Sequence, residues 1–161
     1  GTIAITDHDT LNGVKNLDRN DSIIADSGVE IINGIELSAK TNHGRMHILG
    51  YNIDINNKEL NDKLIELRLN SLYSVLSLIV QIKNDYNIRF SYEEIETLIN
   101  TNSNLGRPDL ARLCIKNGYA TSVQDAFDKY LVDAYQKTRI NDSGLSYEEC
   151  IKLIKDAVLI E

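Results

Sequence analysis

The sequence predicts an α/β protein with an all-helical segment inserted into it. Apolar runs of β type are concentrated in the first 56 residues. From Asn57 onward the apolar residues recur at spacings of three and four, which is the period of an amphipathic helix. We therefore predict a partial α/β domain over residues 1–56, a helical insert over 57–144, and a return to the α/β domain over 145–161.

The first segment has the order β-α-β-β. Asn33-Gly34 interrupts its second apolar run, but the flanking residues are too apolar for a half-exposed hairpin, so we expect one buried strand with a kink or bulge. A buried strand of this kind belongs to a sheet covered on both faces. The expected elements are a strand at 2–5, a polar helix within 11–27, and strands within 29–38 and 46–53.

The helical insert begins with a long amphipathic helix that reaches about Asp85. Several shorter helices follow, because the sequence then shows repeated start and stop signals. These signals are the capping boxes Ser91 to Glu94 and Ser146 to Glu149, Pro108 at a first helical position, Gly118 at a helix end, and Ser122 as an N-cap.

The composition restricts the possible partners. The chain of 161 residues has a formal net charge of −7, which argues against long nucleic acid as a ligand. A phosphate ester would need bound divalent cations to supply positive charge. Two cysteines far apart in sequence suggest neither a disulfide framework nor a cysteine zinc site, so we expect a reducing cytoplasm. No run approaches the ~18 apolar residues of a membrane span, and no membrane partner is expected.

A cluster of polar residues follows the first strand directly. In Thr6-Asp7-His8-Asp9-Thr10 the histidine can ligate a metal through one ring nitrogen while a carboxylate accepts the other N–H. The alternative is an ordinary polar turn that caps a helix, and the stretch by itself does not decide between them.

Two further candidate ligands, Glu36 and His47, stand on apolar strands. A carboxylate in such a strand needs a cationic partner, and a metal shared with His8 and His47 satisfies this need. His47 alone also fits a core histidine bonded to the backbone, and His43 fits a plain turn. Arg107 precedes a helix, where it can hold a phosphate or simply be a surface residue.

Five motifs, in order and spacing, resemble the PHP (polymerase and histidinol phosphatase) family. The branch they are most similar to is that of metal-dependent phosphoesterases, including nucleoside 3′,5′-bisphosphate phosphatases that trim RNA. The resemblance covers about residues 2–156, and the motifs are ITDHDTLNG at 5–13, GIELS at 34–38, HILG at 47–50, GRPDLA at 106–111 and AFDKYL at 126–131.

The resemblance implies a distorted (β/α)7 barrel with a lid-like helical insert, and two or three divalent metals among Mn, Zn, Fe and Mg. By position, the implied metal ligands are His8, Glu36 and His47, with Glu36 bridging two metals. Asp7 and Asp9 flank the ligand histidine and would support it from behind, and Arg107 and Lys129 would bind the substrate phosphate.

The implied activity is hydrolysis of phosphate monoesters of nucleotides or short oligonucleotide ends by a metal-bridged hydroxide. Histidinol phosphate phosphatase is the alternative enzyme, and a non-catalytic structural or interaction domain is the alternative of another class. The family's N-terminal His-x-His, a later histidine and a C-terminal Asp-x-His are absent from these residues, so we expect this segment alone to be inactive.

Overall fold

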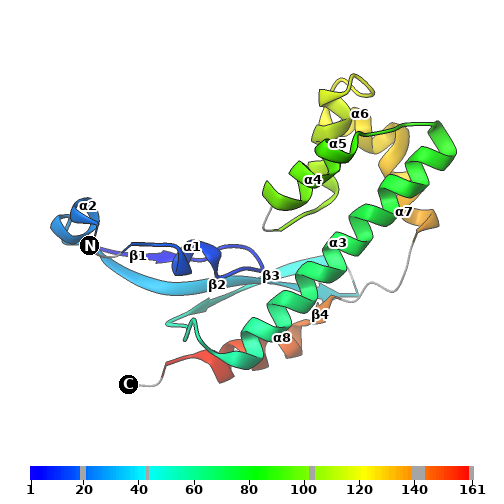
Figure 1. Ribbon diagram of the computed structural model, residues 1–161. Coiled ribbons are helices and arrows are strands. Elements are labelled where there is room, and N and C mark those ends of the chain that lie inside the picture. Colours follow the sequence, from blue (N-terminus) through cyan, green and yellow to red (C-terminus); the bar gives the residue numbers. More distant parts are fainter. Residues whose placement is uncertain (19–20, 43, 102–103, 139–143, 160–161) are drawn as a thin grey trace. The chain divides into compact units, whose positions relative to one another are not determined.

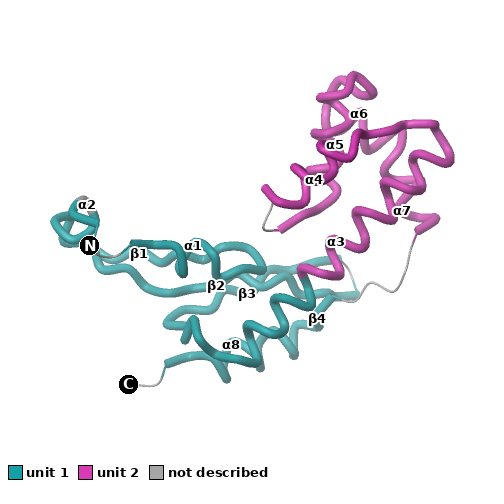
Figure 2. Tube along the Cα trace, in the orientation of Figure 1, with its two compact units in different colours: residues 1–67, 144–161 teal, residues 68–143 magenta. Residues whose placement is uncertain are grey.

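The computed structural model describes residues 1–18, 21–42, 44–101, 104–138 and 144–159. The chain forms two compact units, the first made of residues 1–67 and 144–161 and the second of residues 68–143 (Figure 2). Each unit is described by itself below.

The first unit is built on a mixed four-stranded sheet with β2 (Glu30–Thr41) at its centre (Figure 1). One edge of β2 pairs in parallel with β1 (Thr2–Ile5) and, further along, with the short β4 (Leu145–Ser146). The other edge pairs antiparallel with β3 (Gly44–Tyr51). The predicted α/β class and the predicted strands are confirmed.

Gly34 lies inside β2 rather than in a turn, as the sequence predicts. A Cβ at this position would approach the Thr6 Cγ2 atom to 2.6 Å and the carbonyl oxygens of Ile5 and Gly50 to 3.0 Å. The glycine is therefore required by the close approach of the two neighbouring chain segments to β2, and not by a positive φ angle.

The two faces of β2 have different roles. Successive strand residues point to opposite faces, so Ile35, Leu37 and Ala39 share one face and Glu36 and Ser38 the other. The apolar face is fully buried against α8 (Tyr147–Ala157) and the first turns of α3 (Lys58–Tyr86). The buried core of this unit consists of Leu11, Ile35, Leu37, Ala39, Ile53, Leu60, Leu64, Leu145, Cys150, Leu153 and Ala157.

The predicted helix within 11–27 is wrong in extent. In the described part of this range, residues 11–18 and 21–27, the structure has two short helices, α1 (Asn12–Lys15) and α2 (Ser22–Asp26). The segment has too few apolar residues to bury a continuous helical face. Among its described apolar side chains, Leu11 and Val14 are buried.

The second unit is helical. It contains the later turns of α3, then α4 (Tyr92–Thr101), α5 (Arg107–Lys116), α6 (Val123–Ala126), the π-helical turn η1 (Phe127–Leu131) and α7 (Val132–Lys137). These helices surround one hydrophobic core, in which Leu78, Ile82, Leu110 and Leu131 are completely buried.

The predicted helix starts are confirmed by their hydrogen bonds. The backbone N–H of Glu94 donates to the Ser91 hydroxyl while the Ser91 N–H donates to the Glu94 carboxylate, and Ser146 and Glu149 form the same reciprocal pair. Ser122 caps α6, and Gly118 adopts a φ of 74° just after α5. Pro108 takes the second rather than the first helical position, because α5 begins at Arg107.

The first turns of α3 belong to the sheet-containing unit, although the sequence places the start of the insert at residue 57. Leu60 and Leu64 are buried in the same core as β2, so the compact units divide the chain after residue 67. The three predicted domain segments stay a prediction.

Helix α3 is long and apolar enough, by length and composition, to cross a membrane, and it is the one such helix in the part of the chain that is described. Core helices of soluble proteins pass the same test, and Leu60, Val75, Leu78 and Ile82 of α3 are buried in the two cores. One helix of this kind is a weak indication of a membrane span.

The Gly34→Ala variant tests the close packing around β2. Because the added methyl group meets two backbone oxygens that cannot rotate away, we expect the sheet-containing unit to lose about 1–3 kcal/mol of stability. The midpoint of urea unfolding, followed by circular dichroism, measures this loss. Gly1→Ala is the control, because a Cβ there has no neighbour within 4 Å, and an equal midpoint for both variants would contradict the packing argument.

Candidate metal centre

His8 is held beside Glu36 by backbone hydrogen bonds. After β1 ends, the chain continues along the same edge of β2, where the Glu36 N–H donates to the Asp7 carbonyl at 3.1 Å and the Asp9 N–H donates to the Glu36 carbonyl at 2.8 Å. The resulting parallel bridge pairs His8 with Glu36. Backbone pairing with β2 therefore fixes the position of His8, although it lies beyond the end of β1.

His47 reaches the same place from the opposite edge of β2. In the antiparallel register of β2 and β3, His47 pairs with Ser38, and Glu36 pairs with Leu49. Directly paired residues point to the same face, so His47 shares a face with Ser38 and Glu36. Two histidines on different segments thus flank one strand that carries a carboxylate.

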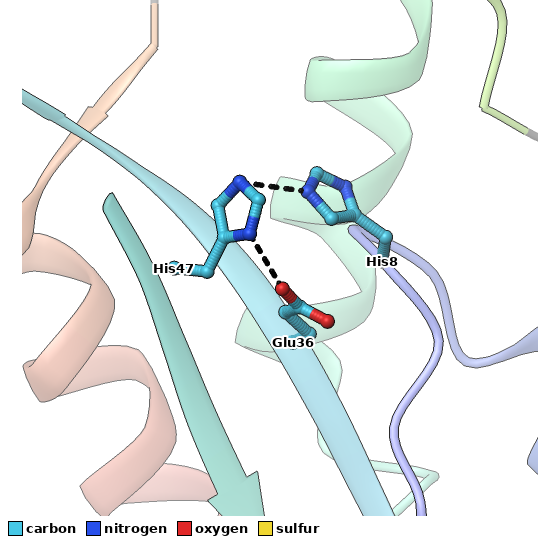
Figure 3. A group of neighbouring side chains, drawn as sticks. All are labelled: His8, Glu36 and His47. Atoms are coloured by element: carbon cyan, nitrogen blue, oxygen red, sulfur yellow. Dashed lines mark hydrogen bonds and ion pairs between the residues drawn. The ribbon is translucent and has the colours of Figure 1, made fainter. Parts of the chain in front are cut away.

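The three predicted metal ligands converge in the structure (Figure 3). Nδ1 of His47 lies 2.6 Å from Oε1 of Glu36, and Nε2 of His47 lies 3.2 Å from Nε2 of His8. One potential ligand atom from each residue lies within 4.8 Å of those of the other two. This arrangement can hold a metal ion. An ordinary polar turn at residues 6–10 would not require the three side chains to converge.

The carboxylate partners of the two Nδ1 atoms indicate one tautomer for both rings. Nδ1 of His8 faces Oδ2 of Asp9 at 3.0 Å, as Nδ1 of His47 faces Glu36. If each Nδ1 carries the proton that is donated to its carboxylate, both Nε2 atoms present lone pairs to each other. Lone pairs at this distance repel unless a proton or a metal ion lies between them.

The separation of the two Nε2 atoms also fits a single ion. Two nitrogen ligands at ~2.0–2.1 Å from one ion, in tetrahedral or octahedral geometry, are roughly 2.9–3.4 Å apart. The measured separation of the two Nε2 atoms is 3.2 Å. The histidine and carboxylate donors of this cluster are those used by zinc, manganese and iron.

Asp9 acts behind His8 and fixes its orientation. While Oδ2 contacts the imidazole, Oδ1 accepts a hydrogen bond from the Ser38 N–H at 2.8 Å. The backbone of Asp9 is left-handed, with a φ of 52°, which a short polar side chain tolerates. Asp9 therefore links the His8 ring to the strand that carries Glu36.

Asp7 has a different environment from Asp9. Its Oδ2 atom accepts the Gly13 N–H at 2.8 Å, and a Cβ on Gly13 would lie only 2.0 Å from that oxygen. The side chain of Asp7 thus holds the start of α1 against the loop that carries His8.

Arg107, in the helical unit, rests on aromatic rings. Its guanidinium carbon lies 4.2 Å from the ring centroid of Tyr135 and 5.8 Å from that of Phe127. Arg107, Val132, Tyr135 and Gln136 line an open pocket of about 450 Å³. Within the described residues no carboxylate forms an ion pair with Arg107, so its N–H donors are available to an anion.

Lys129, the other predicted phosphate ligand, is bound to a carboxylate. Its ammonium group lies 2.9 Å from both carboxylate oxygens of Asp125, one turn earlier. The hydrogen bond to Asp125 raises the pKa of Lys129. Lys129 does not line the Arg107 pocket, and its role in substrate binding stays a prediction. His43 lies outside the described residues.

Sequence reasoning missed Ser38 and Tyr135. Ser38 is the buried polar residue of the first unit, and its hydroxyl lies 3.0 Å from Nε2 of His8. The sequence could have indicated Ser38, because it lies two residues after Glu36 on one strand and such residues point to the same face of the sheet. Tyr135 had no comparable signal, since its contact with Arg107 joins two separate helices.

The chain matches no family model. Curated relatives are nevertheless found: it is 30% identical over 131 residues to the 5′-3′ exoribonuclease Rnm of Salmonella typhimurium, and 29% identical over 131 residues to Rnm of Escherichia coli. Each alignment covers 81% of this chain but 44% of the relative. The chain thus spans less than half the length of these relatives.

Two solved structures share the fold. One, from Bifidobacterium adolescentis, is assigned as a metal-dependent phosphoesterase and matches 96% of this chain with a TM-score of 0.72. The other is an amidohydrolase from Chromobacterium violaceum with bound sulfate, which matches 97% of this chain with a TM-score of 0.74. Both are 22% identical to this chain, which covers 52% and 53% of them respectively. At this identity the likeness establishes the fold alone.

The Asp9→Asn variant tests the support of His8. Asparagine keeps the left-handed backbone but replaces the charged acceptor of the His8 N–H, so we expect Mn²⁺ affinity to fall about 10–100-fold. Isothermal titration of the purified protein with Mn²⁺ measures the effect. Asp7→Asn is the matched control, because its remaining carbonyl oxygen can still accept the Gly13 N–H; equal losses in both variants would contradict a special role for Asp9.

Proposed function

We propose that this chain carries part of the active site of a PHP-type metal-dependent phosphoesterase. The proposed reaction is hydrolysis of phosphate monoesters of nucleotides or of short oligonucleotide ends. The observation that carries the proposal is the convergence of His8, Glu36 and His47 around β2. The exoribonuclease relatives and the phosphoesterase fold neighbour support the hydrolysis of a phosphate ester in general.

The proposed cofactors are two or three divalent ions among Mn, Zn, Fe and Mg, held in part by His8, Glu36 and His47. Such ions, when bound, lower the pKa of a coordinated water and offset the charge of the phosphoryl group. The protein's own contribution is orientation: Asp9 and the Oε1 atom of Glu36 accept the Nδ1 protons and direct both Nε2 atoms inward. The second carboxylate oxygen of Glu36 is the one proposed as a ligand. The remaining ligands would come from parts of the whole protein beyond this chain.

Arg107 is proposed to bind the substrate phosphate. Its stacking on Tyr135 restricts the guanidinium plane and leaves the N–H groups for an anion. The net charge of −7 favours a small substrate over long nucleic acid. We further propose a distorted (β/α)7 barrel for the whole protein and a cytoplasmic location.

The decisive experiment compares Glu36→Gln with the wild type in the full-length protein that contains this chain. Loss of the carboxylate ligand should reduce Mn²⁺ binding and lower phosphate release from nucleoside 3′,5′-bisphosphates by at least about 100-fold. Glu30→Gln is the control. Glu30 lies on the same strand, but its carboxylate accepts a hydrogen bond from the Thr2 hydroxyl and does not belong to the candidate metal site.

Histidinol phosphate serves as the competing substrate in the same assay. Faster turnover of histidinol phosphate would replace the nucleotide assignment. If the wild-type protein neither binds Mn²⁺ nor releases phosphate from either compound, the non-catalytic alternative holds and the enzyme proposal is wrong.

A second prediction concerns Arg107. In the full-length protein, Arg107→Ala should raise KM for the phosphorylated substrate about tenfold or more through loss of a charge-assisted hydrogen bond, while Mn²⁺ affinity stays unchanged. Arg112→Ala is the control on the same helix, because that guanidinium pairs with Asp109 at 2.8 Å. Equal KM values for the two variants would remove Arg107 from substrate binding.

A further inference from the structure

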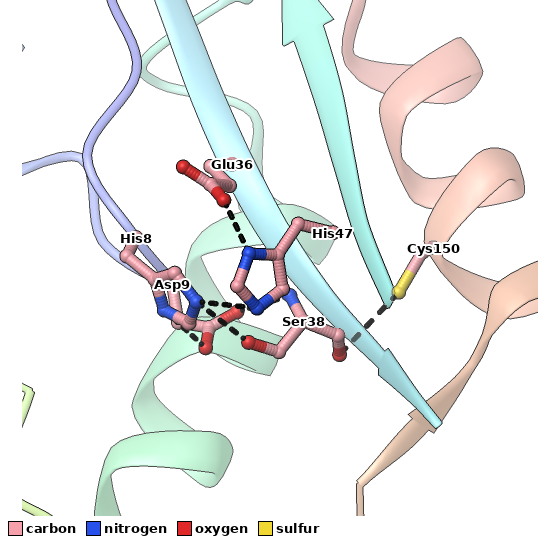
Figure 4. A network of polar contacts seen from close by, with 6 residues as sticks. All are labelled: His8, Asp9, Glu36, Ser38, His47 and Cys150. Carbon is pink, nitrogen blue, oxygen red and sulfur yellow. Dashed lines mark hydrogen bonds and ion pairs between the residues drawn. The ribbon is translucent and has the colours of Figure 1, made fainter. Parts of the chain in front are cut away.

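We propose that Ser38 supplies a fourth donor atom, its hydroxyl oxygen, to the cation site of His8, Glu36 and His47. The inference rests on the proposed metal-dependent function and adds a residue to it. Figure 4 shows Ser38 beside the two imidazole rings, with its hydroxyl directed to His8.

The position of Ser38 follows from the sheet. Ser38 is two residues from Glu36 on β2 and directly opposite His47 on β3, so the three side chains share one face. Its hydroxyl oxygen lies 3.0 Å from Nε2 of His8, the nitrogen that also faces His47. Both separations fall in the roughly 2.9–3.4 Å range expected for two ligands of one ion.

The surroundings of Ser38 hold its hydroxyl in this place. Only 8% of the residue is exposed. Its N–H donates to Asp9 at 2.8 Å, and its carbonyl oxygen accepts a weak contact from the buried Cys150 thiol at 3.8 Å. Both backbone groups are therefore held in place, and burial of the residue limits the space available to its side chain.

A cation at the two Nε2 atoms changes what the hydroxyl can do. In the tautomer assigned above, the Ser38 O–H donates to the lone pair of His8 Nε2. When that lone pair binds an ion, the hydroxyl loses this acceptor, and a buried hydroxyl without a partner is costly. Turning its oxygen lone pair to the same ion satisfies the group without moving the strand.

The first arm of the test measures metal affinity at constant pH. In the full-length protein, Ser38→Ala should weaken Mn²⁺ binding about tenfold by calorimetric titration, and Ser38→Thr, which keeps the hydroxyl, should restore most of the affinity. Thermal unfolding followed by circular dichroism shows whether the alanine variant keeps its fold.

The second arm of the test looks for a new absorption band on Co²⁺ binding, instead of a loss of metal affinity. Ser38→Cys places a thiolate donor where the hydroxyl was, so adding Co²⁺ should produce a sulfur-to-cobalt charge-transfer absorption. Ser27→Cys, at an exposed position after α2, should add no such band to the wild-type spectrum, which serves as the baseline. Within this chain, the native Cys114 and Cys150 are buried.

The outcomes separate the two proposals. If the wild type binds Mn²⁺ but Ser38→Ala binds it equally well and Ser38→Cys shows no charge-transfer band with Co²⁺, the role of Ser38 is wrong while the metal site stands. If the wild type binds no Mn²⁺, the proposed function itself is overturned. If Ser38→Ala does not fold, the charge-transfer band of Ser38→Cys decides the question.

Discussion

The pairing of residues 7–9 with Glu36 is the constraint on which the candidate site depends. Two backbone hydrogen bonds extend the parallel register of β1 and β2 beyond the end of β1, and they carry His8 to the edge of β2. A shift of one residue in this register would turn the His8 side chain to the other face of the sheet. The side-chain geometry of the cluster is therefore a consequence of sheet register.

The same strand provides both the rigidity and the chemistry of the site. Ile35, Leu37 and Ala39 are completely buried under α8 and the start of α3, while Glu36 and Ser38 between them face the histidines. Close packing on one face limits movement of the donors on the other. The buried thiol of Cys150 belongs to the packed face, and burial raises its pKa to about 11, which suits a structural residue and not a nucleophile.

In the helical unit, Arg107 contacts aromatic rings and, within the described residues, has no carboxylate ion-pair partner. Arg107 begins α5 and stacks on Tyr135 of α7, and the π-helical turn η1 that carries Phe127 lies between α6 and α7. By contrast, Lys129 and Lys137 are bound to carboxylates on the surface of the same unit. This difference distinguishes Arg107 from the other cations named here.

The sequence by itself determined the α/β class, the strands, the long helix, the helix caps and three candidate ligands, because periodicity, capping residues and costly polar groups in apolar strands are local signals. It did not determine the break between α1 and α2 or the exact place where α3 leaves the sheet. Only the tertiary structure decided that His8 and His47 approach Glu36 from opposite edges, that Asp9 rather than Asp7 supports His8, and that Ser38 faces the same point. These contacts join residues between 11 and 30 positions apart or depend on the direction of one side chain. Both are set by strand register, which a single sequence does not encode in any local pattern.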